Sequence, residues 1–151
     1  MAQTCVFEQV LVHVGTNYLS RDDADPDDAC EDIEHLLNAI KNLFKCKVVF
    51  SLVLPRVERD DALSGPYELN DRSYDLIEKV RYCNDELIAF CRHNNFETFH
   101  CQAFAMDIED PAPKKYYLSK DGCHLNRNGV VELEHSVLEY IHTHFGVERF
   151  T

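Results

Sequence analysis

The chain has 151 residues, of which 45% are hydrophobic and 28% are charged, a composition typical of one globular domain with room for a core. Acidic residues outnumber Lys and Arg by 27 to 15, which gives a net charge of −12. Nucleic acids and anionic membrane surfaces select clustered basic side chains, so we expect neither as a partner. The sequence contains no apolar run long enough to span a bilayer, and residues 1–9 lack the basic and apolar regions of a signal peptide.

The seven cysteines are odd in number and show no Cys-x-x-Cys spacing. Three of them, Cys30, Cys83 and Cys91, fall on predicted buried helix faces, so we expect reduced, core-filling thiols in a cytoplasmic protein. We expect no metal ion and no cofactor. Four residues of zinc-ligand type lie close together in the sequence, but their spacing matches no standard zinc site: Cys91, His93, His100 and Cys101.

Three apolar runs along the chain indicate β-strands. Val10–Val14 and Lys47–Leu54 are continuous and rich in β-branched residues, which is typical of strands buried on both faces of a sheet. Phe96–Phe104 is a third strand candidate, although His100 interrupts its apolar pattern.

Long amphipathic helices are predicted between these strands. Apolar residues within Ile33–Phe44 recur at i, i+3, i+4 and i+7, and Asp27 or Asp28 can cap this helix. The same spacing runs through Leu76–Cys91. Alternating strands and helices favour a parallel sheet, because each parallel pair needs a crossover connection. We therefore expect residues 1–151 to form a single α/β domain, with a parallel sheet and helices on both of its faces.

The strongest chemical signal is the stretch Asp121-Gly122-Cys123-His124. An Asp three residues before a His, in a turn that contains Gly, can place its carboxylate against the imidazole. The carboxylate would then fix the tautomer of the ring and leave the other ring nitrogen free to act as a base.

Further polar groups follow the first two predicted strands. Gly15 and Asn17 come directly after the first strand, and Arg56 comes after the second. Ligands of open parallel sheets bind beyond the carboxyl ends of the strands, so we expect these residues and the Asp–His pair at one edge of the sheet. Simpler roles remain open: a turn residue for Asn17, a partner of nearby carboxylates for Arg56, and a hydrogen-bonded core histidine for His13.

Four blocks of sequence resemble those of the SGNH (GDSL-type) hydrolases, over nearly the whole chain from Val10 to His144. They are His-Val-Gly-Thr-Asn at 13–17, Ser-Leu-Val-Leu-Pro-Arg at 51–56, Asn84 with Leu87, and Asp-Gly-Cys-His-Leu-Asn at 121–126 followed by Gly129.

This resemblance implies a flavodoxin-like fold and the hydrolysis of small acyl esters through an acyl-enzyme. By the same resemblance, His124 would be the general base and Asp121 its orienting partner. Asn17 and Gly15 would belong to the oxyanion hole, and Arg56 would contact the substrate.

The sequence departs from the family pattern at the nucleophile. The family carries its serine in a Gly-Asp-Ser block upstream of the Gly-x-Asn block, whereas this chain has nine residues before its first predicted strand and no serine among them. We therefore expect a domain that lacks its first strand-helix unit and, alone, has no esterase activity. The nucleophile stays unassigned, with Ser20 and Cys5 the first residues to test.

Two non-enzymatic interpretations also follow from the sequence. A sheet of three strands leaves exposed edges, so the chain could be a binding or scaffold module that uses an edge strand for a homodimer or another protein. It could also be a gene fragment of the kind that mobile elements carry.

Overall fold

The computed structural model describes residues 8–58, 69–101, 104 and 117–145. The chain divides into two compact units, which we treat separately. The first unit comprises Met1–Val53 and Lys79–Phe99, and the second comprises Leu54–Glu78 and His100–Thr151.

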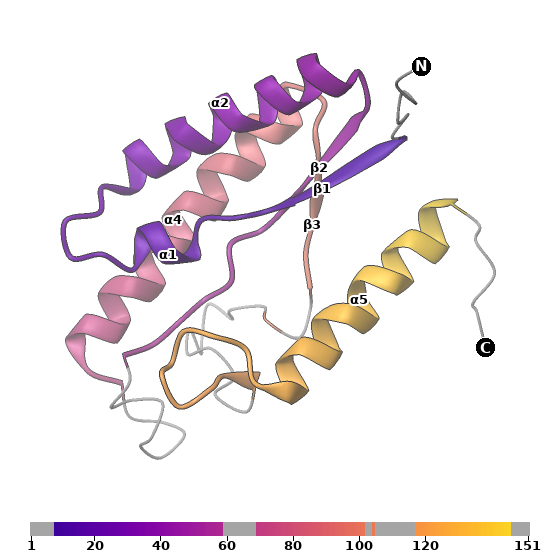
Figure 1. Ribbon diagram of the computed structural model, residues 1–151. Helices are drawn as coiled ribbons and strands as arrows, with labels where there is room; N and C mark the ends of the chain where they lie inside the picture. Colours follow the sequence, from indigo (N-terminus) through magenta and orange to yellow (C-terminus); the bar gives the residue numbers. More distant parts are fainter. Residues whose placement is uncertain (1–7, 59–68, 102–103, 105–116, 146–151) are drawn as a thin grey trace, which may run out of the picture. The chain divides into compact units, whose positions relative to one another are not determined.

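The first unit contains a parallel sheet, as the sequence predicted (Figure 1). Its strands are β1 (Gln9–His13), β2 (Lys47–Ser51) and β3 (Glu97–Phe99), in the order β1-β2-β3. Both neighbouring pairs are parallel, with Val12 opposite Phe50 in the first pair. The predicted α/β class is therefore confirmed, although all three strands are shorter than or offset from the apolar runs that indicated them.

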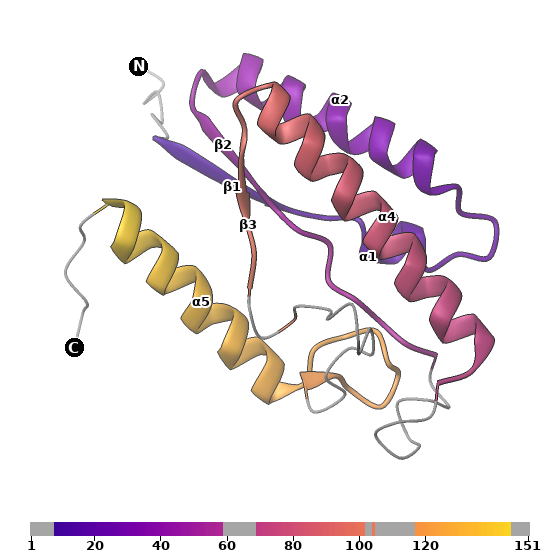
Figure 2. The same ribbon diagram turned by 180° about the vertical axis from the view of Figure 1, so that it is seen from behind.

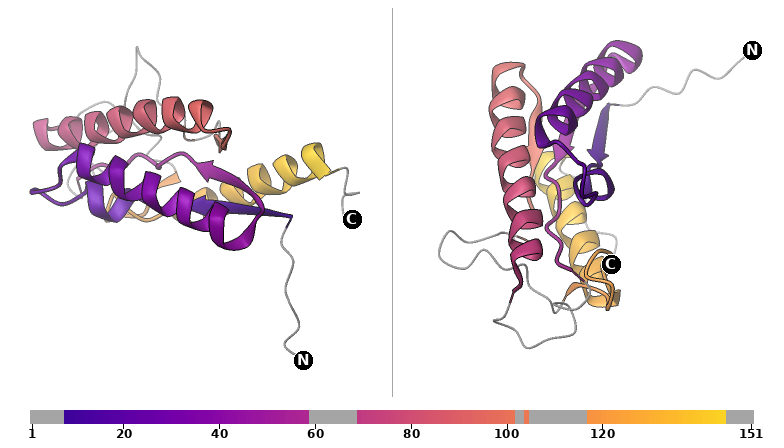
Figure 3. Two further views of the ribbon diagram at one scale, coloured as in Figure 1. Left: turned by 90° about the horizontal axis from the view of Figure 1, so that it is seen from above. Right: turned by 90° about the vertical axis from the view of Figure 1, so that its left-hand side faces the viewer.

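Two long helices cover one face of this sheet. Helix α2 (Pro26–Phe44) connects β1 to β2, and α4 (Asp71–His93) connects β2 to β3. Right-handed crossovers that move in the same direction across a sheet place their helices on the same face. In Figures 1 and 3, α2 and the Lys79–His93 part of α4 accordingly lie together on one side of the strands.

The two apolar strands differ in how deeply they are buried. In β2, Val48, Val49 and Phe50 are all buried, as expected. The same expectation is wrong for β1, where Leu11 is 37% exposed. The cause is position, because β1 ends the sheet and pairs only with β2 among the described strands, so neighbours surround it less completely.

Helix α2 begins earlier than predicted. Its N-cap is Asp25, whose side chain accepts a hydrogen bond from the backbone N–H of Asp27 at 2.9 Å. Pro26 then occupies the first helical position, where its missing N–H costs nothing. The predicted apolar stripe is buried at Ile33 and Leu37 but reaches solvent at the end of the helix, where Leu43 is 75% exposed.

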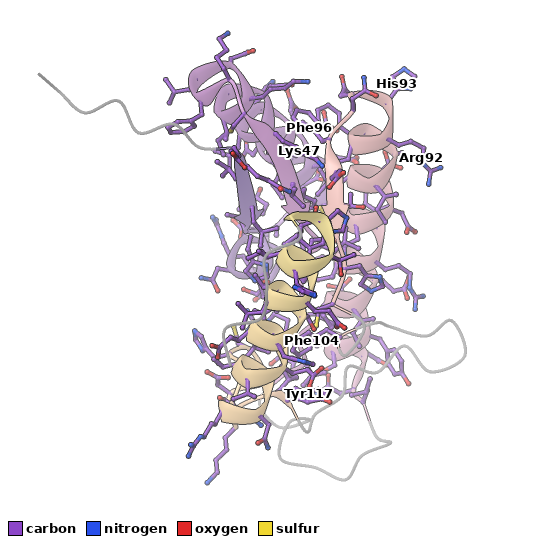
Figure 4. The ribbon with its side chains drawn as sticks, turned by 90° about the vertical axis from the view of Figure 1, so that its right-hand side faces the viewer. Lys47, Arg92, His93, Phe96, Phe104 and Tyr117 are labelled. Carbon is purple, nitrogen blue, oxygen red and sulfur yellow. The ribbon has the colours of Figure 1, made fainter. Side chains whose placement is uncertain are left out.

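The second unit is built from a hairpin-like turn, the helix that follows it and the segment after β2. Leu118 and Leu125 form an antiparallel bridge that closes the turn. Helix α5 (Arg127–Phe145) starts two residues later. Figure 2 shows this helix following the turn. Phe104 packs edge-on against Tyr117, with ring centroids 5.4 Å apart (Figure 4). The apolar cluster of this unit joins three chain segments: Val57, Leu69, Ile77, Leu118 and Leu125.

Candidate active site

Asp121 and His124 form the hydrogen-bonded pair that the sequence predicted. Oδ2 of Asp121 lies 2.6 Å from Nδ1 of His124. The other carboxylate oxygen, Oδ1, accepts hydrogen bonds from the backbone N–H groups of Cys123 at 2.9 Å and His124 at 3.0 Å. One carboxylate therefore binds the imidazole and also holds the backbone of the turn.

The pair is open to solvent, and its carboxylate is strongly acidic. The His124 side chain is 74% exposed and that of Asp121 is 48% exposed. The hydrogen bond from His124, together with those from the backbone N–H groups of Cys123 and His124, lowers the pKa of Asp121 to about 2. The carboxylate is thus ionised at neutral pH and can orient the ring, leaving Nε2 of His124 accessible.

The turn that carries this pair rests on the segment after β2. The N–H of Val57 donates to the carbonyl of Gly122 at 3.0 Å. Gly122 has φ +72°, and a Cβ at this position would lie 2.3 Å from the carbonyl oxygen of Val57. Only glycine combines this backbone conformation with so close an approach.

Asn126 joins the turn to helix α5. Its Nδ2 donates to the carbonyl of Leu118 at 3.0 Å, and its Oδ1 accepts from the N–H of Gly129 at 3.0 Å. The second bond is an N-cap, as the asparagine after the Asp–His block suggests. Gly129 is needed because a Cβ there would lie 2.3 Å from the carbonyl oxygen of Tyr117. The turn is therefore fixed at both ends.

Arg56 belongs to the same unit as the Asp–His pair. It precedes Val57, whose N–H bonds the turn, and it follows the buried residue Pro55. Its Nε is buried and has no hydrogen-bond partner among the described residues. The simpler role predicted for Arg56, pairing with a carboxylate, is not seen in the described part of the chain; nearby Glu58 pairs instead with Arg72, at 2.6 Å.

Gly15 and Asn17 lie in the first unit, at the carboxyl end of β1. Gly15 has φ +114°, and a Cβ there would lie 2.9 Å from Cγ2 of Val53. Asn17, whose simpler predicted role was that of a turn residue, lies in the one-turn helix α1 (Thr16–Leu19). Its side chain is exposed, and its carbonyl accepts a hydrogen bond from Oγ of Ser20 at 2.6 Å.

Behind Gly15, a buried amide fixes the backbone just after β2. Oδ1 of Asn84 accepts from the N–H of Val53 at 2.8 Å, and its Nδ2 donates to the carbonyl of Val53 at 3.0 Å. Asn84 thus supplies the hydrogen bonds that a neighbouring strand would otherwise provide.

His13 and Ser51 form a contact that the sequence did not indicate. Nδ1 of His13 lies 2.9 Å from Oγ of Ser51 on the neighbouring strand. Partial burial of the ring lowers the pKa of His13, because it disfavours the charged form. The predicted hydrogen bond of His13 is confirmed, but its predicted place in the core is wrong, because His13 ends the outer strand β1 and is exposed. The register of β1 and β2 could have revealed its partner.

Four of the described serines have side-chain hydrogen bonds, and in each case the partner is a group other than His124. Ser51 bonds His13, Ser73 bonds the N–H of Glu58, and Ser136 lies 3.0 Å from Sγ of Cys101. Ser20 bonds its own helix turn. Cys5, the other nucleophile candidate, lies outside the described residues. The described residues also contain no group of three or more His, Cys, Asp or Glu side chains that could hold a metal ion.

The structure thus brings together some of the predicted site residues. Asp121 and His124 are in direct contact, and Arg56 is next to the residue that bonds their turn. Gly15 and Asn17 are close in sequence and belong to the other unit. None of the helices in the described part of the chain is long and apolar enough to cross a membrane.

Comparison with known proteins gives a consistent result for the fold. No protein-family model matches the sequence, and no curated protein matches it. Among solved structures, a GDSL-like lipase from Bacteroides thetaiotaomicron matches 90% of this chain with a TM-score of 0.66 and 21% identity. A proposed acylhydrolase from Bacteroides fragilis matches 90% of the chain, with a TM-score of 0.66 and 17% identity. A structure named for a proposed platelet activating factor from Streptococcus pneumoniae matches 89%, with a TM-score of 0.61 and 19% identity.

The chain spans only part of the length of these proteins. It covers 62% of each Bacteroides chain and 59% of the streptococcal chain. At these identities the likeness concerns the fold and not the activity. The chain therefore has an α/β fold of the SGNH (GDSL-type) hydrolase kind.

Proposed function

We propose that this chain carries the base half of an acyl-ester hydrolase site and that its serine nucleophile comes from another segment or another chain. The observation that supports this most directly is the 2.6 Å contact between Asp121 and His124, with the histidine side chain open to solvent. In a neutral imidazole, an ionised carboxylate at Nδ1 holds the ring proton on that nitrogen, so that Nε2 can take the proton of an attacking hydroxyl.

The other predicted site residues take supporting roles in this proposal. Asn17 would donate its side-chain amide to the developing oxyanion, and Gly15 would keep the backbone before it in the required conformation. Arg56 would contact the substrate through its guanidinium group, whose buried Nε has no acceptor among the described residues. The substrate class is a small acyl ester.

The first test is hydrolysis of p-nitrophenyl acetate by the purified chain and two variants. His124→Ala removes the proposed base, and His144→Ala removes a similarly exposed histidine whose Nδ1 contacts a backbone carbonyl instead of a carboxylate. We expect the three rates to agree within about twofold, because the proposal takes the nucleophile from outside this chain. A wild-type rate roughly 10³-fold above that of His124→Ala would contradict the proposal that the nucleophile comes from outside this chain. Ser20→Ala would then be the first variant measured, to test Ser20 as the nucleophile.

The base itself is tested separately by nuclear magnetic resonance. We expect the Asp121 carboxyl group to titrate with a pKa of about 2 and to return toward its ordinary value in His124→Ala. We also expect imidazole ¹⁵N shifts of the neutral His124 ring, recorded at alkaline pH, that show a proton on Nδ1 and none on Nε2. An ordinary pKa for Asp121, or a proton on Nε2, would rule out His124 as the proposed base, whatever the ester assay shows.

A second candidate function, a protein-binding module, is favoured by the exposed edge of the sheet. Strand β1 pairs with β2 alone among the described strands. Leu11 on this strand is 37% exposed, and Val14 just after it is 38% exposed. An end strand with exposed apolar side chains can pair with a strand of another molecule. A second copy of this chain is the simplest such partner.

Light scattering after size-exclusion chromatography tests this candidate. We expect a concentration-dependent dimer that Leu11→Lys abolishes, because a charge on the edge strand opposes pairing. Leu43→Lys is the matched control, since this leucine is 75% exposed but lies on helix α2 instead of on a strand. A monomer at all concentrations, or equal loss of the dimer in both variants, would reject pairing through β1.

A further inference from the structure

Two buried cysteines from different helices lie against each other in the first unit. Sγ of Cys30 on α2 lies 3.2 Å from Sγ of Cys83 on α4. Cys30 is 6% exposed and Cys83 is fully buried. A disulfide needs its sulfur atoms about 2.05 Å apart, so the pair is about 1 Å from bonding distance. The contact joins residues 53 positions apart in the sequence.

The two thiols are not equivalent. The S–H of Cys30 donates to Sγ of Cys83. This hydrogen bond lowers the pKa of Cys83 and raises that of Cys30, because it stabilises a thiolate at position 83 only while Cys30 keeps its proton. Cys83 is therefore the sulfur that ionises first and attacks an oxidant, and Cys30 is positioned to resolve the product.

We propose that Cys30 and Cys83 are an oxidation site at which hydrogen peroxide forms a disulfide between α2 and α4. Both residues belong to the same unit, and their helices are already held together beside the pair by a hydrogen bond from the hydroxyl of Tyr82 to the Asp27 carboxylate. Bond formation therefore requires a small local approach of two packed helices and no rearrangement of the fold.

The reaction balances with peroxide as the only oxidant. The Cys83 thiolate attacks one peroxide oxygen, the O–O bond breaks, and the departing hydroxide takes up a proton to become water. The product is a sulfenic acid on Cys83. The sulfur of Cys30 then attacks this sulfenic sulfur, the S–S bond forms and the S–O bond breaks, and the Cys30 proton leaves with the hydroxide as a second water.

The pair is connected by direct contacts to the Gly15–Asn17 segment. Asn84, next to Cys83 in sequence, holds the backbone of Val53 through two hydrogen bonds. Val53 in turn packs against Gly15, as does Ile33, which lies one helical turn after Cys30. A cross-link between the two helices is therefore expected to alter the environment of Gly15 and Asn17.

Peptide mapping of the peroxide-treated wild-type chain tests the proposal without a variant. The half-exposed thiols of Cys46 and Cys123 are first blocked by alkylation under native conditions. We then expect a cross-linked peptide that contains Cys30 and Cys83. Its mass should be about 2 Da lower than the summed mass of the two reduced peptides, and a reducing agent should separate them again. The oxidised chain should melt on the order of 10 °C higher, because the bond closes a long loop of the unfolded chain.

Cys91 provides the internal control. It is fully buried on the same helix, and burial raises its pKa to about 11, so it should stay reduced while the pair reacts. Cys83→Ala should lose both the cross-link and the melting shift, whereas Cys91→Ala should keep both. Amide resonances of Gly15 and Asn17 should move on oxidation. Preferential oxidation of Cys91, or a chain whose Cys30 and Cys83 stay reduced after peroxide oxidises other thiols, would overturn the proposal.

Discussion

Gly122→Ala should destabilise the chain by about 3 kcal/mol and displace the Asp–His pair. The new Cβ would lie 2.3 Å from the carbonyl oxygen of Val57, far inside contact distance, and 3.1 Å from that of Glu58, which is a tight contact. The obstructing atoms are backbone, so no side-chain rotation can relieve the overlap. The backbone at residue 122 is also left-handed, at φ +72°, which costs an alanine about 1 kcal/mol by itself.

The overlap can be removed only by moving the turn away from the segment after β2. That movement breaks the hydrogen bond from the N–H of Val57 to the carbonyl of Gly122 and exposes part of the cluster around Val57. The carboxylate of Asp121 is held by N–H groups of the same turn, so its contact with His124 should weaken as well. We therefore expect the pKa of Asp121 to rise from about 2 toward its ordinary value.

Urea unfolding and the Asp121 titration measure the two effects independently. Cys123→Ala is the matched control, since this residue is the half-buried neighbour of Gly122 in the same turn and its substitution should change stability by less than about 1 kcal/mol. Equal unfolding midpoints for Gly122→Ala and wild type would show that the turn does not rest on Val57. A normal midpoint with an altered Asp121 pKa would place the effect in the turn alone.

The local parts of the site could be predicted from the sequence because local spacing determines them. Asp121 reaches His124 across a turn of four residues, and Asn126 caps the helix that begins at the next residue. Both contacts are hydrogen bonds over three residues, which a short motif specifies. The central strand β2 was likewise predictable, since its apolar run is buried on both faces.

Contacts between distant segments could not be predicted in the same way. The apolar run of β1 resembles that of β2, yet Leu11 is exposed because β1 ends the sheet. The sulfur contact between Cys30 and Cys83 joins residues 53 positions apart, and the bond from Val57 to Gly122 joins two loops. Helical periodicity places each cysteine on a buried face, but only the packing of α2 against α4 makes them neighbours.

Asn84→Ala should lower the free energy of unfolding by about 3 to 4 kcal/mol, through the loss of buried hydrogen bonds instead of a steric overlap. The buried side chain makes two hydrogen bonds, one with the N–H and one with the carbonyl of Val53. Val53 is itself buried, so water cannot replace either bond without entering the core. Each backbone group left without a partner costs about 1–3 kcal/mol, to which the small cavity adds. Asn94→Ala is the control, because the Asn94 amide makes a similar bond to the carbonyl of Phe90 in an exposed position.

Asn84→Asp separates the loss of hydrogen bonds from the loss of volume. One aspartate oxygen can still accept from the N–H of Val53, but the other faces a carbonyl that needs a donor. Burial and this repulsion should raise the pKa of the new carboxyl group, because only its protonated form can donate to the carbonyl. An acid whose folded-state pKa is raised stabilises the fold as the pH falls, so the variant's deficit relative to wild type should shrink from pH 7 to pH 5. A deficit that does not change with pH would mean that the amide acts by filling space. The segment just after β2, beside Gly15, would then be held by packing instead of by the two hydrogen bonds.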